Sequence, residues 1–199
     1  TGVQTCALPI FYALYMYHRT DEDNCQLIDS AKDFSDVGMF YRKNAVELAD
    51  FASKQLVTSK NPQTFVSAQE KQFIFHAYRK NNAVAIAVTT EDYPSRVAYS
   101  ILREIMTEHD QCGGKYPGGK SQVIANGIVK YQDPKNADKL AQIQSNLDEI
   151  KEIMVTNLEN AIGRGEKLNE MAQKSEELSQ QSKMFAREAD KMNKCCTMI

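Results

Sequence analysis

The chain has 199 residues, of which 42% are hydrophobic and 25% are charged, and its formal net charge is −2 at pH 7. This length suits one modest domain with an extension, and the composition excludes wholesale disorder. The nearly neutral charge provides no basic excess for nucleic acid. The five cysteines show neither C-x-x-C pairs nor zinc spacing, and no apolar run approaches the about 18 residues of a membrane span. We therefore expect a cytosol-facing protein with no metal or other cofactor.

Residues 1–10 form an atypical N-terminal extension without periodicity, and the first clear element is a strand over Phe11–His18. Its aromatic and aliphatic side chains fill both faces, which is typical of a strand buried on both sides of a sheet. Strict alternation predicts one face with Phe11, Ala13, Tyr15 and Tyr17, and the other with Tyr12, Leu14 and Met16.

The rest of residues 11–133 predicts an α+β fold, an antiparallel sheet sandwiched by helices. In chain order the expected elements are a strand over Gln26–Ala31, a helix over Asn44–Val57, strands over Thr64–Ser67, Gln72–Arg79 and Ala83–Thr89, and helices over Ser95–His109 and Ser121–Val129. Lys80-Asn81-Asn82 is a good hairpin turn, because asparagine tolerates positive φ. A linker over 134–139 follows.

Residues 140–194 predict one long helix with a heptad repeat. Steps of three and four define a set of positions that we call the seam: Leu140, Ile143, Leu147, Ile150, Met154, Asn157, Ala161, Arg164, Leu168, Met171, Ser175, Leu178, Ser182, Phe185, Ala189 and Met192. Twelve of these sixteen are apolar, which indicates a coiled-coil strand. Gly163 and Gly165 each weaken an isolated helix by about 1 kcal/mol, so we expect the free segment to be loosely ordered.

Arg164 is the one charged residue of the seam. A coiled coil can tolerate a single arginine whose side chain snorkels to water. Alternatively, Arg164 fixes the register, because a guanidinium in a buried layer needs oxygen acceptors from every facing helix.

The terminus 195–199 reads Cys195-Cys196-Thr197-Met198-Ile199 and matches a C-a-a-X lipidation box. We expect prenylation of Cys196. One lipid chain binds a bilayer only marginally, so a palmitoyl group on Cys195 is the expected second anchor. A chance match to the pattern is the alternative.

A nucleotide-binding function is an alternative hypothesis, because Gly114–Ser121 satisfies the phosphate-loop pattern G-x-x-x-x-G-K-S. The loop follows a predicted helix instead of a strand, so a glycine-rich surface loop is the expected structure. His18, His76 and His109 stand apart in the sequence and are expected to be structural. We predict no catalytic residue.

The block Ile162–Leu168 within the seam resembles the arginine-bearing R-SNARE motif, and Asp92–Tyr99 resembles the signature of longin domains. With the lipidation box, the chain is similar to the prenylated longin R-SNAREs of the synaptobrevin superfamily. The resemblance implies a profilin-like longin domain and membrane fusion through a parallel four-helix bundle with three Q-SNARE helices. It also implies cycling between the cytosol and the cytoplasmic face of endomembranes.

We further expect an intramolecular contact between the longin domain and the seam, because an exposed seam would aggregate. Phe51 on the first amphipathic helix is expected to line the groove that receives it. Two other functions stay open: a prenylated nucleotide-binding switch that uses Gly114–Ser121, and a lipid-anchored coiled-coil tether.

Overall fold

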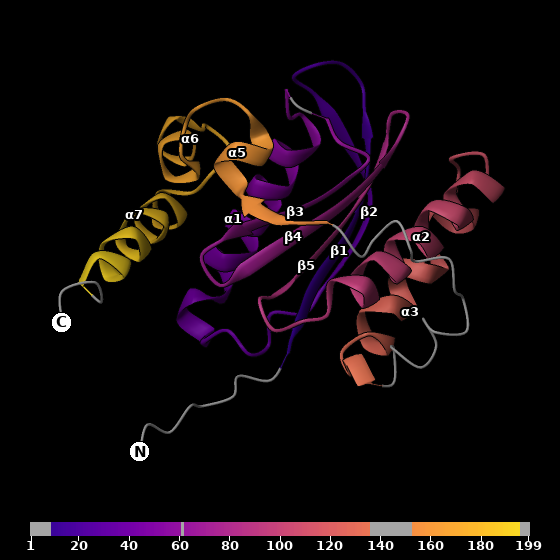
Figure 1. The fold of residues 1–199 in the computed structure, drawn as a ribbon, viewed down its shortest axis with the longest axis horizontal. Helices are drawn as coiled ribbons and strands as arrows, with labels where there is room; N and C mark the ends of the chain where they lie inside the picture. Colours follow the sequence, from indigo (N-terminus) through magenta and orange to yellow (C-terminus); the bar gives the residue numbers. More distant parts are fainter. Residues whose placement is uncertain (1–8, 61, 136–152, 196–199) are drawn as a thin grey trace.

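The computed structural model describes residues 9–60, 62–135 and 153–195, with side chains up to Arg187. Within this part, one sheet has the strand order β2-β1-β5-β4-β3-β6 (Figure 1). Neighbouring strands are antiparallel, except that β6 runs parallel to β3. The strands are β1 (Phe11–Arg19), β2 (Cys25–Lys32), β3 (Phe65–Glu70), β4 (Phe73–Lys80), β5 (Ala83–Thr90) and β6 (Val155–Asn157).

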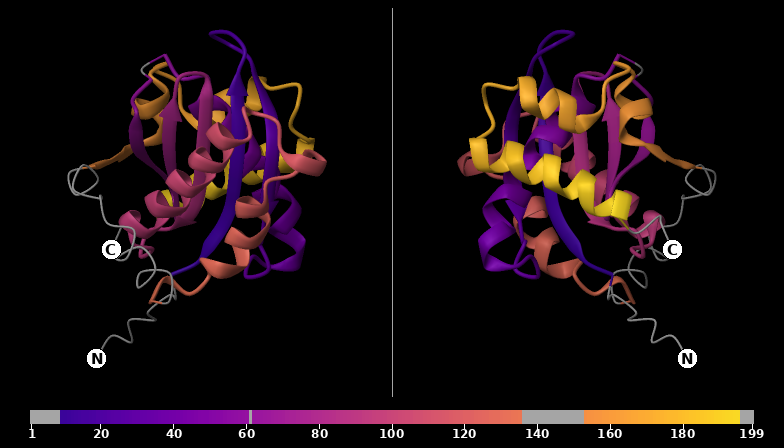
Figure 2. Two further views of the ribbon diagram at one scale, coloured as in Figure 1. Left: turned by 90° about the vertical axis from the view of Figure 1, so that its right-hand side faces the viewer. Right: turned by 90° about the vertical axis from the view of Figure 1, so that its left-hand side faces the viewer.

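Helices cover both faces of the sheet, which confirms the predicted α+β sandwich. One face carries α1 (Met39–Val57), and the other carries α2 (Ser95–Gln111), the short turn η1 (Pro117–Gly119) and α3 (Gln122–Lys130). The C-terminal helices α5 (Leu158–Ile162), α6 (Leu168–Lys174) and α7 (Gln180–Cys195) lie on the α1 side (Figures 1 and 2).

The central strand β1 contributes to two hydrophobic cores, one on each face of the sheet. Every side chain from Phe11 to Tyr17 is at most 5% exposed, which confirms that the strand is buried on both faces. The predicted alternation is wrong at its start, because Phe11 packs with Leu14 on the α2 side and Tyr12 packs on the α1 side. The pairing of β1 with β5 shifts register between Phe11 and Ala13, and this irregularity exchanges the two faces.

The stretch Asp92–Tyr99 ties α2 to the rest of the domain. Pro94 occupies the N-cap position of α2, and the buried Tyr93 hydroxyl donates a 2.8 Å hydrogen bond to the carbonyl oxygen of Tyr131, just after α3. Tyr99 is fully buried, with its hydroxyl 3.1 Å from Ser67 Oγ on β3. The hairpin predicted at Asn81 is confirmed, with φ 54° at this residue.

The predicted single helix over 140–194 differs from the structure. Residues 153–195 contain β6, α5, α6 and α7 in place of a continuous helix. Gly163 and Gly165 both adopt positive φ, which ends α5 and turns the chain. The heptad pattern predicts which residues would share one face of a continuous helix. In this structure the segment packs on α1 and β3 instead, and these contacts determine its backbone conformation.

Candidate functional site

The described C-terminal segment, residues 153–195, forms the candidate site together with α1 and the edge strand β3. Its strand β6 pairs with β3, so that Val155 lies opposite Ser67 and Asn157 lies opposite Gln69. This pairing satisfies backbone groups that an edge strand leaves open. Figure 1 shows α1 between the sheet and the C-terminal helices.

Apolar side chains of the C-terminal segment complete the core on the α1 side. Leu158 and Ile162 are both 0% exposed and belong to the same cluster as Ala52 and Leu56 of α1. The other buried members from this segment are Ala161, Leu168, Met171, Ala172, Leu178 and Ala186. Burial of this kind is the main favourable contribution to folding, so these residues hold the segment on the domain.

The seam is therefore partly covered in this conformation. Its buried members are Ala161, Leu168, Met171, Leu178 and Ser182, whereas Ser175 and Phe185 are half-buried and Met154 and Asn157 are exposed. Leu140, Ile143, Leu147 and Ile150 lie outside the described residues, as do the side chains of Ala189 and Met192. Leu158 and Ile162 are not seam positions, and the sequence analysis missed them.

Arg164 follows α5 and reaches two parts of the folded domain. Its Nη2 lies 3.3 Å from Asp23 Oδ1 in the β1–β2 loop and 3.3 Å from the carbonyl oxygen of Thr58 at the end of α1. Its side chain is 27% exposed, and among the described residues its buried Nε has no hydrogen-bond partner. The guanidinium thus finds oxygen acceptors within its own chain.

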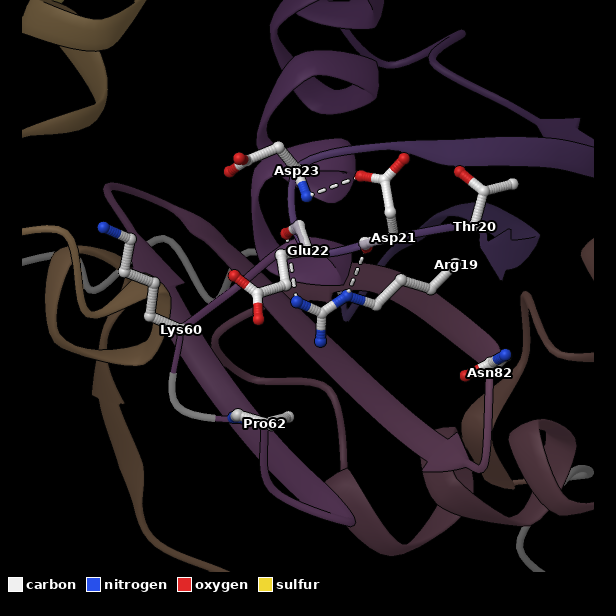
Figure 3. Close-up of a pocket in the computed structure, with 8 residues that line it drawn as sticks. All are labelled: Arg19, Thr20, Asp21, Glu22, Asp23, Lys60, Pro62 and Asn82. Atoms are coloured by element: carbon white, nitrogen blue, oxygen red, sulfur yellow. Dashed lines mark hydrogen bonds between the residues drawn. The ribbon is translucent and has the colours of Figure 1, made fainter.

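The loop that presents Asp23 is held in place by local hydrogen bonds. Arg19 Nε donates to the carbonyl oxygen of Asp21 at 2.9 Å and Arg19 Nη2 donates to that of Glu22 at 3.0 Å, while the Asp23 amide donates to the Asp21 carboxylate (Figure 3). Hydrogen bonds from Asp23 and Asn24 lower the pKa of Asp21. The loop borders an open polar pocket of about 690 Å³ that Lys60 and Asn82 also line (Figure 3).

A second polar contact joins α7 to α1. The Glu47 carboxylate accepts hydrogen bonds from the hydroxyls of Ser179 and Ser182, both at 2.7 Å. These two hydrogen bonds lower the pKa of Glu47, with the Ser182 contact the larger cause. Ser182 is 0% exposed, and its buried hydroxyl has a hydrogen-bond partner in Glu47. A serine suits the apolar seam of a coiled coil poorly, but it suits this contact. The sequence analysis missed Glu47, although the serines at seam positions were a usable signal.

Phe51 lies where the C-terminal segment meets the domain. It is 6% exposed, belongs to the core cluster on the α1 side, and lines a pocket of about 300 Å³ together with Leu178 and Cys25.

The loop Gly114–Ser121 does not offer its helix N-terminus to a phosphate. The N-terminus of α3, where a phosphate would bind, is occupied by Glu108, which accepts from the Gln122 amide at 3.0 Å and from the Ser121 hydroxyl. Asp29 accepts from the Ser121 amide at 2.8 Å. Two carboxylates at this position would repel an anion, and the loop follows helix α2 instead of a strand. This geometry argues against the nucleotide alternative.

The C-terminal cysteines lie at the limit of the described chain. Cys195 is the last residue of α7, and Cys196 lies outside the described residues. In the described ranges, no helix is both long and apolar enough to cross a bilayer.

Comparisons with known proteins cover both parts of the chain. Residues 139–198 match the family model described as Synaptobrevin, and residues 34–129 match the Longin model, described as a regulated-SNARE-like domain. The chain is 32% identical over 185 residues to Synaptobrevin homolog ykt6 of Schizosaccharomyces pombe, covering 89% of this chain and 94% of that protein. It is 32% identical over 180 residues to VAMP-like protein YKT61 of Arabidopsis thaliana, covering 87% and 90%. Synaptobrevin homolog YKT6 of Yarrowia lipolytica is 30% identical over 191 residues, covering 91% and 96%.

Proposed function

Because the chain belongs to the longin-domain R-SNARE family, whose members act in vesicle-membrane fusion, we propose that this structure is the closed, resting state of a fusion protein. In this state the longin domain holds the R-SNARE segment and prevents its assembly. Opening releases the segment, which then forms a parallel four-helix bundle with three Q-SNARE helices.

The observation that carries the proposal is that the closed state buries side chains of the seam that a four-helix bundle would also bury. Ala161, Leu168, Met171, Leu178 and Ser182 are buried in the closed state, and a bundle would need the same side chains in its layers. A bundle also requires a continuous helix, whereas Gly163 and Gly165 adopt positive φ here. The two conformations therefore exclude each other, and their free-energy difference sets the fraction of chains that is open and able to assemble.

Arg164 has a matching double role in this proposal. In the bundle it would form the central layer, with three partner glutamine side chains as acceptors. In the closed state Asp23 and the Thr58 carbonyl take the place of those acceptors. A guanidinium always carries its charge, so it needs acceptors in both states.

Anchoring is proposed to use a prenyl group on Cys196 and a palmitoyl group on Cys195. Thioester acylation is reversible, so the protein would cycle between the cytosol and the cytoplasmic face of endomembranes. Cys196→Ser should leave the protein wholly in the supernatant of fractionated cells, and Cys195→Ser should release it readily from membranes, since one lipid anchors weakly. Equal, tight retention of both variants would contradict the two-lipid anchor.

The test of the main proposal is assembly with candidate Q-SNARE helices. The full-length chain should form a heat-resistant complex that contains one copy of each partner, and it should do so more slowly than the free segment 140–194. The comparison isolates the longin domain, because both samples carry the same seam. If the full-length chain assembled as fast as the segment, the closed state would not be inhibitory.

A further inference from the structure

The ends of helices α1 and α5 cap each other. The Lys60 amide, just after α1, donates a 3.1 Å hydrogen bond to the carbonyl oxygen of Ile162, the last residue of α5. In return, Arg164 Nη2, just after α5, lies 3.3 Å from the carbonyl oxygen of Thr58, the C-cap residue of α1. Carbonyl groups at a helix end have no partner within their own helix, so each contact satisfies a group that its helix leaves open. We call these two contacts, together with Asp23 beside them, the junction.

The atoms of the junction that face Arg164 Nη2 are hydrogen-bond acceptors. Besides the Thr58 carbonyl oxygen, Nη2 lies 3.3 Å from Asp23 Oδ1 and 3.4 Å from Thr58 Oγ1. The Thr58 hydroxyl donates its hydrogen to the carbonyl oxygen of Lys54 at 3.2 Å, so Oγ1 presents a lone pair to the guanidinium. The negative end of the α1 dipole lies at the same place. The junction therefore suits a positively charged donor.

Among the described residues, Asp23 is the carboxylate that pairs with Arg164. The charged side chains of the domain around the junction balance, with Asp21, Glu22 and Asp23 against Arg19, Lys60 and Arg79. Arg19 and Arg79 are bound by backbone carbonyl oxygens at 2.9 Å and 2.8 Å, and the Asp21 carboxylate accepts from amides of its own loop. Lys60 and Asp23 border the same open pocket (Figure 3). The preference for a cation thus comes from the contact with Asp23 and not from the net charge of the surface.

Side-chain length makes this contact specific for arginine. A glutamine at position 164 would end at the level of Nε, and a lysine would end short of Nη2. Neither would present the donors of a guanidinium to both Asp23 and Thr58. Among the described residues the buried Nε of Arg164 has no hydrogen-bond partner, so the closed state satisfies the guanidinium incompletely. The junction thus holds an arginine but leaves it available to a more complete set of acceptors.

We propose that Asp23 is the specificity-determining residue with which the longin domain holds an arginine-bearing segment and rejects a glutamine-bearing one. Apolar packing on α1 does not distinguish between the heptad seams of two SNARE segments, whereas the junction does. The surface of α1 and β3 would therefore close on the chain's own segment when Q-SNARE helices are also present. The inference rests on the proposed closed state and adds the residue that chooses the segment.

The test measures amide hydrogen exchange in the full-length chain without lipid. The Lys60 amide is a direct probe, because its acceptor, the Ile162 carbonyl, belongs to the C-terminal segment. Asp23→Asn keeps the size of the side chain and removes its charge. Glu22→Gln is the matched control, because Glu22 is exposed in the same loop and its side chain has no described contact with Arg164. Exchange at Lys60 and in β6 should be about two- to fivefold faster in Asp23→Asn and unchanged in Glu22→Gln, since a partly exposed ion pair contributes modestly.

A double-mutant cycle tests the choice of side chain at position 164. Arg164→Gln should accelerate exchange at Lys60 about five- to tenfold, and Arg164→Lys should lie between it and the wild type. In the Arg164→Gln background, Asp23→Asn should have no further effect, because the contact is already lost. Equal exchange in Asp23→Asn and Glu22→Gln, or additive effects of Asp23→Asn and Arg164→Gln, would overturn the proposal. The measurement contains no partner helix, so its failure is distinguishable from a failure to assemble the bundle.

Discussion

Ile162 offers a way to weaken the closed state without touching the bundle. Its side chain is 0% exposed in the core cluster with α1, yet it is not a seam position. Replacing it by alanine removes buried apolar atoms from the closed state only. Alanine is also the best helix former, so the continuous helix of the bundle should not suffer.

The expected loss of stability of the closed state follows from the burial of the Ile162 side chain. Truncation of a buried isoleucine to alanine costs about 2–5 kcal/mol, with the low end applying where the surroundings can collapse into the space. Helix α5 has only 5 residues and lies on the surface of α1, so we expect about 2–3 kcal/mol. That value corresponds to a shift of roughly 30- to 150-fold in the equilibrium between closed and open chains.

Two measurements check this prediction for Ile162→Ala. Assembly with Q-SNARE helices should accelerate, by up to the same factor if opening limits the rate, and amide hydrogen exchange in Val155–Ile162 should accelerate as well. Leu168→Ala is the matched control, because Leu168 is buried in the closed state and is also a seam residue. It should accelerate opening but lower the melting temperature of the finished complex. Unchanged assembly and unchanged exchange in Ile162→Ala would refute the view that this packing holds the chain closed.

Two further predictions concern the charged sites. Lys120→Ala should leave nucleotide binding undetectable by calorimetry, as in the wild type, because Glu108 and Asp29 already fill the N-terminus of α3; micromolar binding that disappears in this variant would contradict the assignment of the loop. Arg164→Glu should reduce the yield of heat-resistant complex at least about tenfold, since a carboxylate replaces the donors of the central layer, whereas Arg164→Gln should assemble nearly normally. Equal, wild-type yields for both variants would show that Arg164 is not in the central layer.

Much of the longin domain could be predicted from local pattern. Phe11–Tyr17 is buried on both faces, as its continuous apolar composition indicates, and Asn81 occupies the turn that its tolerance of positive φ favours. The bulge near Tyr12 could not be predicted, because it depends on the register that β1 adopts against β5. A one-residue irregularity exchanges faces without changing the sequence signal.

The closed site was less accessible to sequence reasoning. A heptad repeat identifies Leu168 and Leu178 because their spacing is local, but it describes the segment with partner helices present. The contact of Glu47 with Ser182 joins residues 135 positions apart and belongs to a different state of the same chain. The pair Gly163 and Gly165 was the one local sign that the helix could break.

His76 leads to a prediction about acid. It is buried to 1% exposure on β4, and burial lowers its pKa from 6.5 to about 3. Thr89 Oγ1 donates to the Thr90 carbonyl oxygen and therefore accepts from His76 Nε2–H at 3.1 Å. Nδ1 is left to accept from the Ser67 hydroxyl at 2.8 Å. This arrangement satisfies a neutral imidazole, whereas a second N–H would require the Ser67 hydroxyl to turn and accept, and would leave a charged ring in a fully buried position.

The direction of the pH effect follows from these two pKa values. Between pH 6.5 and about 3 the unfolded chain binds a proton at His76 that the folded chain excludes, so the contribution of His76 to stability is complete above pH 6.5 and is lost as the pH falls. At pH 5 the loss is about 2 kcal/mol of unfolding free energy. Urea unfolding at pH 7 and pH 5 measures it, and His76→Gln, which cannot titrate, should show a difference smaller by that amount.

His109→Gln is the appropriate control for the acid effect, because burial also lowers the pKa of His109, although that ring is more exposed. The remaining pH dependence in His76→Gln then belongs to His109 and to the carboxylates. Ser67 is opposite Val155 in the β3–β6 pairing and contacts the His76 ring, so we expect protonation of His76 to weaken the pairing that holds the R-SNARE segment. The protection of the β6 amides, measured relative to their intrinsic exchange rates at each pH, should fall between pH 7 and pH 5 in the wild type but not in His76→Gln. If the wild type and His76→Gln lost the same unfolding free energy between pH 7 and pH 5, the hydrogen bonds of His76 with Ser67 and Thr89 would not explain the sensitivity of the closed state to acid.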